Sequence, residues 1–333
     1  MSSEPPYERY WKIDPHIHCR DWRESYKATI YGVTRKALSK GIGAIFDMPN
    51  TDPPILGLDE ARKRIRTADQ QGVLQHYFLY VAATPSEMQL RRAVRAYEEI
   101  DRVVGLKLYT APMKDLEARG IEEQSLIYRV LTDLDYRGVL AIHCEKYEML
   151  SEKLWDPSRP YTWNSARPPE AEVECVKQQL FLAERSYFKG TIYFVHISTP
   201  ESVLLIRRAK ERGINVVCGV TPHHLIFDTD HMRSPESVVL KVNPPIREKT
   251  LVDALRRLVA SGHIDFLETD HAPHSPSEKV WHPYLSGIRS LEIYDEVLRM
   301  LIDWGASENV IYMMTRRNAE RIFNKVEDLL RNI

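Results

Sequence analysis

The sequence predicts an α/β fold, a (β/α)8 barrel of the TIM type, on three observations. Eight short runs of β-branched and aromatic residues alternate with longer polar segments rich in Arg and Glu, as buried parallel strands alternate with helices. A glycine stands at most junctions from a helical segment to a strand, where it supplies the left-handed residue that ends a helix. Eight such units need about 250 residues or more, and the chain has 333.

Taken in order, the predicted strands cover residues 10–19, 42–48, 73–83, 103–109, 139–144, 191–197, 214–220 and 263–267. Six of these strands directly follow a glycine, namely Gly41, Gly72, Gly138, Gly190, Gly213 and Gly262. An open doubly wound sheet is the alternative, but it predicts a glycine-rich phosphate turn after the first strand, and the sequence has none there. We expect a single domain over residues 1–333, with the barrel core at about residues 10–305 and terminal helices at residues 307–333.

Composition excludes several classes of protein. The formal net charge is −1, so the chain lacks the basic excess of a protein held by nucleic-acid phosphates. The four cysteines form no C-x-x-C pair, which argues against a zinc knuckle and favours reduced thiols in the cytoplasm. No apolar run approaches the roughly 18 residues that cross a bilayer, and residues 1–12 do not resemble a signal peptide. We expect a cytoplasmic protein that binds neither nucleic acid nor membrane.

In a barrel of this type the active site lies at the carboxyl ends of the strands. Alone, a histidine there is usually a hydrogen-bonded core residue. Here ligand-type side chains stand together at the ends of the predicted strands: His16, His18, Lys107, His143, His196 and Asp270. So many polar groups are costly to bury without partners, whereas imidazole and carboxylate groups are good zinc ligands. Their joint placement predicts a metal site at one mouth of the barrel.

Lys107 is the exception in this set, because an ammonium group cannot bind a metal ion. Burial lowers the pKa of a lysine. The neutral amine can then react with CO₂ and form a carbamate, an anionic group that can bridge two ions. The alternative is an ordinary lysine paired with an acid such as Asp47.

These residues stand in motifs that resemble dihydroorotase of the amidohydrolase superfamily. The similarity runs in order from about residue 13 to residue 323, nearly the whole chain. It is carried by Asp14-x-His16-x-His18-x-Arg20, Met48-Pro49-Asn50-Thr51, Gly105-Leu106-Lys107-Leu108-Tyr109, His143-x-Glu145, His196-Ile197-Ser198-Thr199, Thr221-Pro222-His223-His224-Leu225, Lys241-Val242-Asn243-Pro244-Pro245-Ile246-Arg247 and Thr269-Asp270-His271-Ala272-Pro273-His274.

The resemblance implies an enzyme of de novo pyrimidine (UMP) biosynthesis that interconverts (S)-dihydroorotate and N-carbamoyl-L-aspartate. It also implies two zinc ions per chain, the first held by His16, His18 and Asp270 and the second by His143 and His196. Carboxylated Lys107 and a hydroxide would bridge the ions, and Asp270 would be the catalytic proton shuttle. The implied substrate contacts are Arg20, Asn50, Asn243, His274, Ser286 and Gly287.

Some features depart from the family pattern or leave alternatives open. Cys19 and Ser290 stand where relatives commonly have other residues. Only 13 residues precede Asp14, so we expect the small β-sandwich of many relatives to be absent. The metal ligands alone would also suit an allantoinase or hydantoinase, although Arg20 and Asn50 favour a substrate with a carboxylate.

A non-catalytic partner of aspartate carbamoyltransferase is a further alternative, but such a scaffold should lose ligands that this sequence keeps. A homodimer and a complex with aspartate carbamoyltransferase both remain open. For Arg20, the alternative to a substrate contact is a salt bridge with Asp21 or Asp47. Residues 275–284 lack a periodic apolar pattern and predict a mobile loop over the site.

Overall fold

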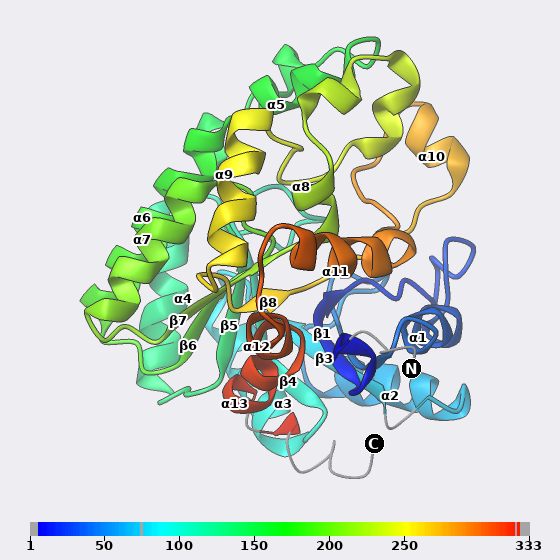
Figure 1. Ribbon diagram of the computed structural model, residues 1–333. Helices are drawn as coiled ribbons and strands as arrows, with labels where there is room; N and C mark the ends of the chain where they lie inside the picture. The colour runs from blue at the N-terminus through cyan, green and yellow to red at the C-terminus, as the bar shows by residue number, and fades with distance from the viewer. Residues whose placement is uncertain (1–5, 74–75, 324, 327–333) are drawn as a thin grey trace.

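Eight parallel strands form one sheet in the residues described by this computed structural model, 6–73, 76–323 and 325–326 (Figure 1). Each strand pairs with the next along the chain, and a parallel bridge between Ile17 and His271 brings the end of the sheet back to its first strand. The predicted barrel is therefore confirmed. The strands are β1 (Lys12–Ile17), β2 (Ile42–Asp47), β3 (Tyr77–Ala82), β4 (Val103–Tyr109), β5 (Val139–His143), β6 (Thr191–Phe194), β7 (Val216–Val220) and β8 (Phe266–Leu267).

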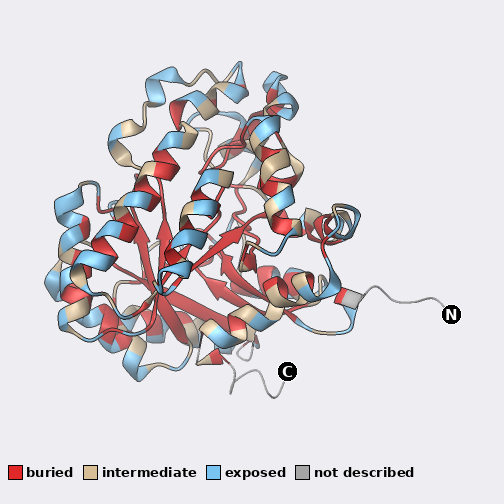
Figure 2. Ribbon diagram, turned by 60° about the vertical axis from the view of Figure 1, so that its left-hand side comes forward, coloured by how far each residue is buried: buried red, intermediate tan, exposed pale blue. Residues whose placement is uncertain are grey.

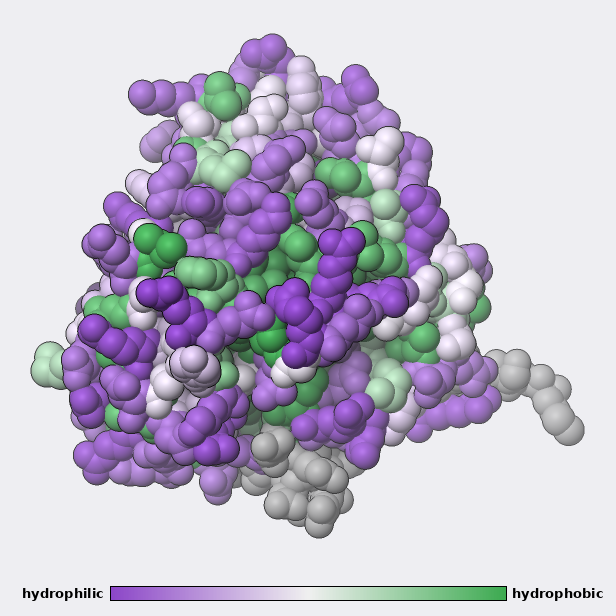
Figure 3. All heavy atoms as spheres, turned by 90° about the vertical axis from the view of Figure 1, so that its left-hand side faces the viewer, coloured by the Kyte–Doolittle hydropathy of each residue, from purple (hydrophilic) through white to green (hydrophobic). Residues whose placement is uncertain are grey.

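Long helices follow most of the strands and cover the outside of the barrel. They are α1 (Ile30–Leu38), α2 (Leu58–Gln70), α3 (Glu87–Glu99), α4 (Ile121–Asp133), α6 (Pro169–Ser186), α7 (Pro200–Glu211), α9 (Lys249–Ala260) and α11 (Tyr294–Asp303). Figure 2 shows that the strands are buried while each helix is buried on one side only. Hydrophilic side chains prevail on the outer face, with apolar side chains between them (Figure 3). This is the pattern of amphipathic helices packed on a sheet.

The glycines at the helix-to-strand junctions serve two different purposes. At four of the six predicted junctions φ is positive, between 68° and 88°, as a helix-ending glycine requires: Gly41, Gly72, Gly213 and Gly262. The prediction is wrong for Gly138 and Gly190, which do not have positive φ. A Cβ atom at Gly138 would lie 2.5 Å from the Tyr136 hydroxyl, and one at Gly190 would lie 2.5 Å from the carbonyl oxygen of Gly138. These two glycines permit close packing.

Some predicted strands are shorter in the structure. The run 263–267 forms a strand only at Phe266–Leu267, and the His263 amide donates to the Leu258 carbonyl in the turn that follows α9. The run 191–197 ends as β6 at Phe194, and His196 then has a φ of 40°. A non-glycine residue rarely adopts that conformation in a strand. Strand β6 therefore ends two residues before the candidate ligand His196.

The barrel interior is filled by large aromatic side chains. Phe46, Phe78, Tyr80, Tyr193 and Phe266 form part of one buried cluster inside the sheet. A separate cluster fills the layer between the sheet and the surrounding helices.

The terminal segment lies below the sheet in Figure 1 and contributes to the interior cluster. It consists of α12 (Glu308–Tyr312), the π-helical turn η9 (Met313–Arg317) and α13 (Asn318–Ile322). Phe323 is only 2% exposed, and its ring centroid lies 4.9 Å from that of Phe46. Residues 324 and 327–333 of the predicted terminal helices lie outside the described residues.

Short elements stand at the opposite end, over the carboxyl ends of the strands (Figure 1). They include α5 (Trp163–Ala166), α8 (Pro222–Ile226), η7 (Pro235–Leu240) and α10 (Pro276–Val280). The predicted loop 275–284 therefore contains a helical turn, which Ser275 and Glu278 close with a reciprocal capping box. Within the described ranges, no helix is both long enough and apolar enough to cross a membrane.

Candidate active site

A cavity of about 620 Å³ opens at the carboxyl ends of the strands. Its lining includes every residue that the sequence analysis placed in the site, namely His16, His18, Arg20, Asn50, Lys107, His143, His196, Asn243, Asp270, His274, Ser286 and Gly287. Indole and phenol rings from the loops above the barrel complete the wall. The site therefore combines a polar floor with a partly aromatic mouth.

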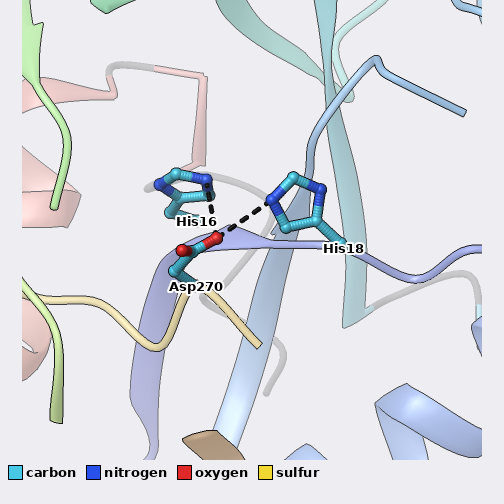
Figure 4. Close-up of side chains that lie close together, drawn as sticks. All are labelled: His16, His18 and Asp270. Atoms are coloured by element: carbon cyan, nitrogen blue, oxygen red, sulfur yellow. Dashed lines mark hydrogen bonds and ion pairs between the residues drawn. The ribbon is translucent and has the colours of Figure 1, made fainter. Parts of the chain in front are cut away.

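His16, His18 and Asp270 form a group that could hold a metal ion (Figure 4). His18 Nε2 lies 3.0 Å from Asp270 Oδ1, and His16 Nε2 lies 3.4 Å from the same oxygen. All three side chains are buried, and one ligand atom from each lies within 4.8 Å of the others. The Asp270 amide also donates to the His16 carbonyl, which joins the end of β8 to β1.

Hydrogen bonds orient His18 toward this group. Its Nδ1 lies 3.0 Å from the Asn50 amide oxygen, which can only accept a hydrogen bond. The tautomer with its proton on Nδ1 satisfies this bond and points the lone pair of Nε2 at the Asp270 carboxylate. Two acceptors that face each other suit a bound cation. Asn50, predicted to contact substrate, thus also positions a candidate metal ligand.

His143 and His196 form a second pair of candidate ligands. His143 Nδ1 lies 3.0 Å from His196 Nε2, while His143 Nε2 lies 2.7 Å from a carboxylate oxygen of Glu145. Burial lowers the pKa of both histidines, which favours the neutral form that binds metals. The His196 ring centroid lies 5.2 Å from that of His16, so the two groups adjoin.

The Arg167 guanidinium holds the Glu145 carboxylate in place through hydrogen bonds. Burial alone would raise the pKa of its carboxyl, but the Arg167 guanidinium beside it lowers that pKa well below the usual range. The ionised carboxylate can accept a hydrogen bond from the N–H at His143 Nε2, and the lone pair of His143 Nδ1 then faces His196. The sequence motif contained Glu145, but its role follows only from this contact.

Lys107 lies in β4 with its side chain fully buried. Its Nζ has no hydrogen-bond partner in the described part of the chain, and burial lowers its pKa to about 7. The alternative pairing with Asp47 is wrong, because Asp47 Oδ2 accepts from Arg64 at 2.7 Å and from the Tyr77 hydroxyl at 2.5 Å. A neutral amine without a partner is the form that a carbamate requires.

Unpartnered atoms around the floor support the same interpretation. Among the described residues, His16 Nδ1, His196 Nδ1 and Lys107 Nζ are buried without a hydrogen bond. Such groups are rare in folded proteins, because each loses its contact with water without compensation. The donor set and the unpartnered Lys107 amine fit a metal centre.

Glu268 is a buried carboxylate to which the sequence analysis assigned no role. Its Oε1 lies 3.6 Å from His16 Nδ1 and accepts a hydrogen bond from the His196 amide. A Cβ atom at Gly219 would lie 2.5 Å from Glu268 Oε2, so this glycine makes room for the carboxylate. In the sequence, the feature that could have identified Glu268 is an acidic residue at the end of an apolar strand, two residues before Asp270.

Arg20 and the residues around it form one side wall of the cavity. Arg20 Nε donates to the Pro273 carbonyl at 3.0 Å, and Nη2 lies 3.0 Å from His274 Nε2. The alternative salt bridge to Asp21 or Asp47 is not formed. Asp21 accepts hydrogen bonds from Ile30 and Gln71, among others, and Asp47 has the partners named above.

Asn243, Ser286 and Gly287 lie on the facing loops. Asn243 Oδ1 accepts from the Trp163 indole at 3.1 Å and from the Ser286 hydroxyl at 3.1 Å. The Ser286 carbonyl lies 3.0 Å from His274 Nε2. Side-chain and main-chain contacts thus connect Asn243, Ser286 and His274 to one another.

The chain resembles known amidohydrolases in sequence and in fold, although no protein-family model matches it. It is 31% identical over 270 residues to the dihydroorotase of Ruminiclostridium cellulolyticum, covering 80% of this chain and 60% of that protein. It is 30% identical over 298 residues to the dihydroorotase of Trichlorobacter lovleyi, covering 88% of this chain and 67% of that protein.

Solved structures agree on the fold. L-hydantoinase from Arthrobacter aurescens matches with a TM-score of 0.80 at 22% identity, over 94% of this chain and 70% of that one. D-hydantoinase from Thermus sp. matches with a TM-score of 0.77 at 20% identity, over the same shares of the two chains. The chain spans about 60% of the length of the first curated relatives that it matches. It belongs to the dihydroorotase-like amidohydrolases.

Proposed function

We propose that this protein is a zinc-dependent dihydroorotase, which interconverts (S)-dihydroorotate and N-carbamoyl-L-aspartate in pyrimidine biosynthesis. The observation that carries the proposal is the placement of Arg20. Its buried guanidinium group lines the same cavity as the His16, His18 and Asp270 group. A planar guanidinium recognises a carboxylate through two parallel hydrogen bonds. Dihydroorotate carries a carboxylate next to its cyclic amide, whereas hydantoin and dihydrouracil do not.

Two zinc ions per chain would be held by the two groups of ligands. His16, His18 and Asp270 would hold the first ion, and His143 and His196 the second, with carboxylated Lys107 as the bridge. The buried, unpartnered amine of Lys107 supports that bridge. When bound, zinc lowers the pKa of water and polarises a carbonyl group.

The side chains of the protein would supply orientation and proton transfer. Arg20 binds the carboxylate of the ring and fixes the cyclic amide above the floor of the cavity. Asp270 accepts a proton from the attacking water and gives it to the ring nitrogen as the C–N bond breaks. Asn50 holds His18 in the orientation that the site requires. Ring closure follows the same steps in reverse.

A comparison of the rates on three cyclic amides tests the proposal. Initial rates are measured with zinc-loaded protein on dihydroorotate, allantoin and dihydrouracil, with and without added aspartate carbamoyltransferase as a partner. We expect dihydroorotate to have the highest kcat/KM, since it alone in this set carries a carboxylate next to the cyclic amide for Arg20. Faster turnover of allantoin or dihydrouracil would contradict the proposal and favour the alternative cyclic amidohydrolases. No turnover of any ring in either arm would favour a non-catalytic relative.

A further inference from the structure

Lys279 makes an uncommon set of contacts behind one wall of the cavity. The residue lies in α10, and its Nζ donates to the carbonyl oxygens of Lys241 at 2.9 Å, Leu285 at 3.0 Å and Gly287 at 2.8 Å. An ammonium group has three N–H donors, so these bonds use all of them. The Gly287 amide also donates to the Lys241 carbonyl at 2.9 Å. Residues 285–287 are thereby fastened to Lys241.

The arrangement is costly, which argues against an incidental surface lysine. Lys279 is only 9% exposed, and its three hydrogen bonds, within the described part of the chain, all go to backbone carbonyls and none to a carboxylate. Burial, with the positive charges of Lys241 and Arg20 nearby, lowers its pKa to about 7. Burying a cation without an opposite charge is unfavourable unless its donors are satisfied.

The loop that Lys279 holds leads directly to Arg20. Ser286 donates to Asn243, and its carbonyl lies 3.0 Å from His274 Nε2, the atom that Arg20 Nη2 also approaches at 3.0 Å. A shift of residues 285–287 would therefore change the surroundings of His274 Nε2 and, through this ring, the position of one neighbour of Arg20. Contact between Lys279 and substrate is not needed for this effect.

Lys241 fastens the same loop from the other side. Its Nζ donates to the Tyr284 carbonyl at 2.8 Å and lies 4.1 Å from the ring centroids of both Trp155 and Trp163. A cation between two indole faces is a favourable arrangement. The Lys241 carbonyl accepts a hydrogen bond from Lys279. The two lysine side chains therefore bind the carbonyl groups of neighbouring residues in one loop, Tyr284 and Leu285.

Helix α10 is in turn anchored to the segment after β1. Glu278 accepts from the Tyr26 hydroxyl at 2.8 Å and pairs with Lys27 at 3.2 Å. The neighbouring residues Glu278 and Lys279 thus connect the segment that follows Arg20 to the loop that carries Ser286. Helix α10 therefore contacts both walls of the cavity.

We propose that Lys279 is a positioning residue that fixes residues 285–287 relative to Arg20 and so determines how tightly the cavity binds an anionic cyclic amide. The substrate part of this inference rests on the proposed function. The loop part rests only on the contacts of Lys279.

The test compares zinc-loaded Lys279→Met with wild type. Met keeps the length and the apolar stem of the side chain but has no donor. We expect KM for dihydroorotate to rise about 10-fold or more with kcat changed less than about threefold. The variant loses binding energy that the bound substrate and the transition state share, which raises KM and leaves kcat nearly unchanged. Amide hydrogen exchange at residues 285–287 should become faster, and zinc content should stay unchanged. Lys177→Met on the exposed face of α6 is the matched control and should leave all four quantities unchanged.

Thermal unfolding shows whether Lys279→Met is folded. If it is not, a second variant provides the test. Lys279→Arg keeps the charge, but a planar guanidinium cannot place donors on three carbonyls that converge on one nitrogen. We expect KM and the rate of amide hydrogen exchange to rise in this variant too, but by less than in Lys279→Met. Wild-type KM together with wild-type exchange in a folded variant would overturn the inference. Faster exchange with unchanged KM would overturn its link to substrate binding. If wild type does not hydrolyse dihydroorotate, exchange alone decides whether Lys279 holds the loop.

Discussion

Replacing Arg20 by Lys would remove the planar fork while keeping the positive charge. In the structure the guanidinium uses Nε on the Pro273 carbonyl and Nη2 near His274, and the side chain is only 6% exposed. These contacts hold the group rigid and leave its remaining N–H donors for a ligand. A Lys ammonium is a single point charge that cannot keep the Pro273 contact and also present two parallel donors.

The expected loss follows from the hydrogen bonds that the variant cannot form. A hydrogen bond to a charged group contributes about 1.5–3 kcal/mol, and each 1.4 kcal/mol is about tenfold in rate. Arg20→Lys should therefore lower kcat/KM for dihydroorotate by about 10- to 150-fold. Slow hydrolysis of dihydrouracil, which lacks the carboxylate, should change by less than about threefold.

The assay measures kcat/KM for both rings with wild type and variant at matched zinc content. The ratio between the two substrates is the decisive quantity, because it cancels any general loss of active protein. An equal fall on both rings would identify Arg20 as a structural residue and remove the main support for a carboxylate-bearing substrate.

Three further predictions concern the metal centre and the barrel. Lys107→Ala should lose the second zinc ion and nearly all activity; wild-type turnover, with two ions by metal analysis, would exclude the carbamate bridge. Asp270→Asn should keep the fold, as circular dichroism would report, but lower kcat by ~10²-fold or more because an amide cannot accept the proton; near-normal kcat with unchanged metal content would refute its role as a shuttle. Phe323→Ala should lower the free energy of unfolding in urea by about 3–5 kcal/mol, because it leaves a cavity among the aromatic rings inside the barrel; a loss below about 1 kcal/mol would show that the terminal segment adds little to the core.

The fold was predictable because strands buried on both faces leave a strong local pattern. The predicted run 103–109 coincides with β4, and a glycine precedes several of the other strands. Predicted strand boundaries were wrong where contacts distant in sequence fix the backbone, such as the hydrogen bond from the His196 amide to Glu268. The end of β6 depends on the left-handed backbone at His196, which no local preference of the sequence indicates.

The candidate ligands were also predictable, because each stands at the end of a predicted strand. Residues that act through backbone atoms were not. Lys279 bonds the carbonyl of Lys241, 38 residues away, and in sequence it looks like any lysine of a polar segment. The contact of Asn50 with His18 likewise joins two strand ends and depends on the register between β1 and β2.

We propose that the cavity at the carboxyl ends of the strands is a metal-dependent catalytic site for a cyclic amide. Metal-free protein is titrated with zinc while dihydroorotate hydrolysis and bound zinc are measured in the same samples. We predict no turnover without zinc, a rise as ions bind, and a plateau at two ions per chain. Full turnover by metal-free protein would contradict the claim, and a plateau at one ion would contradict the binuclear site.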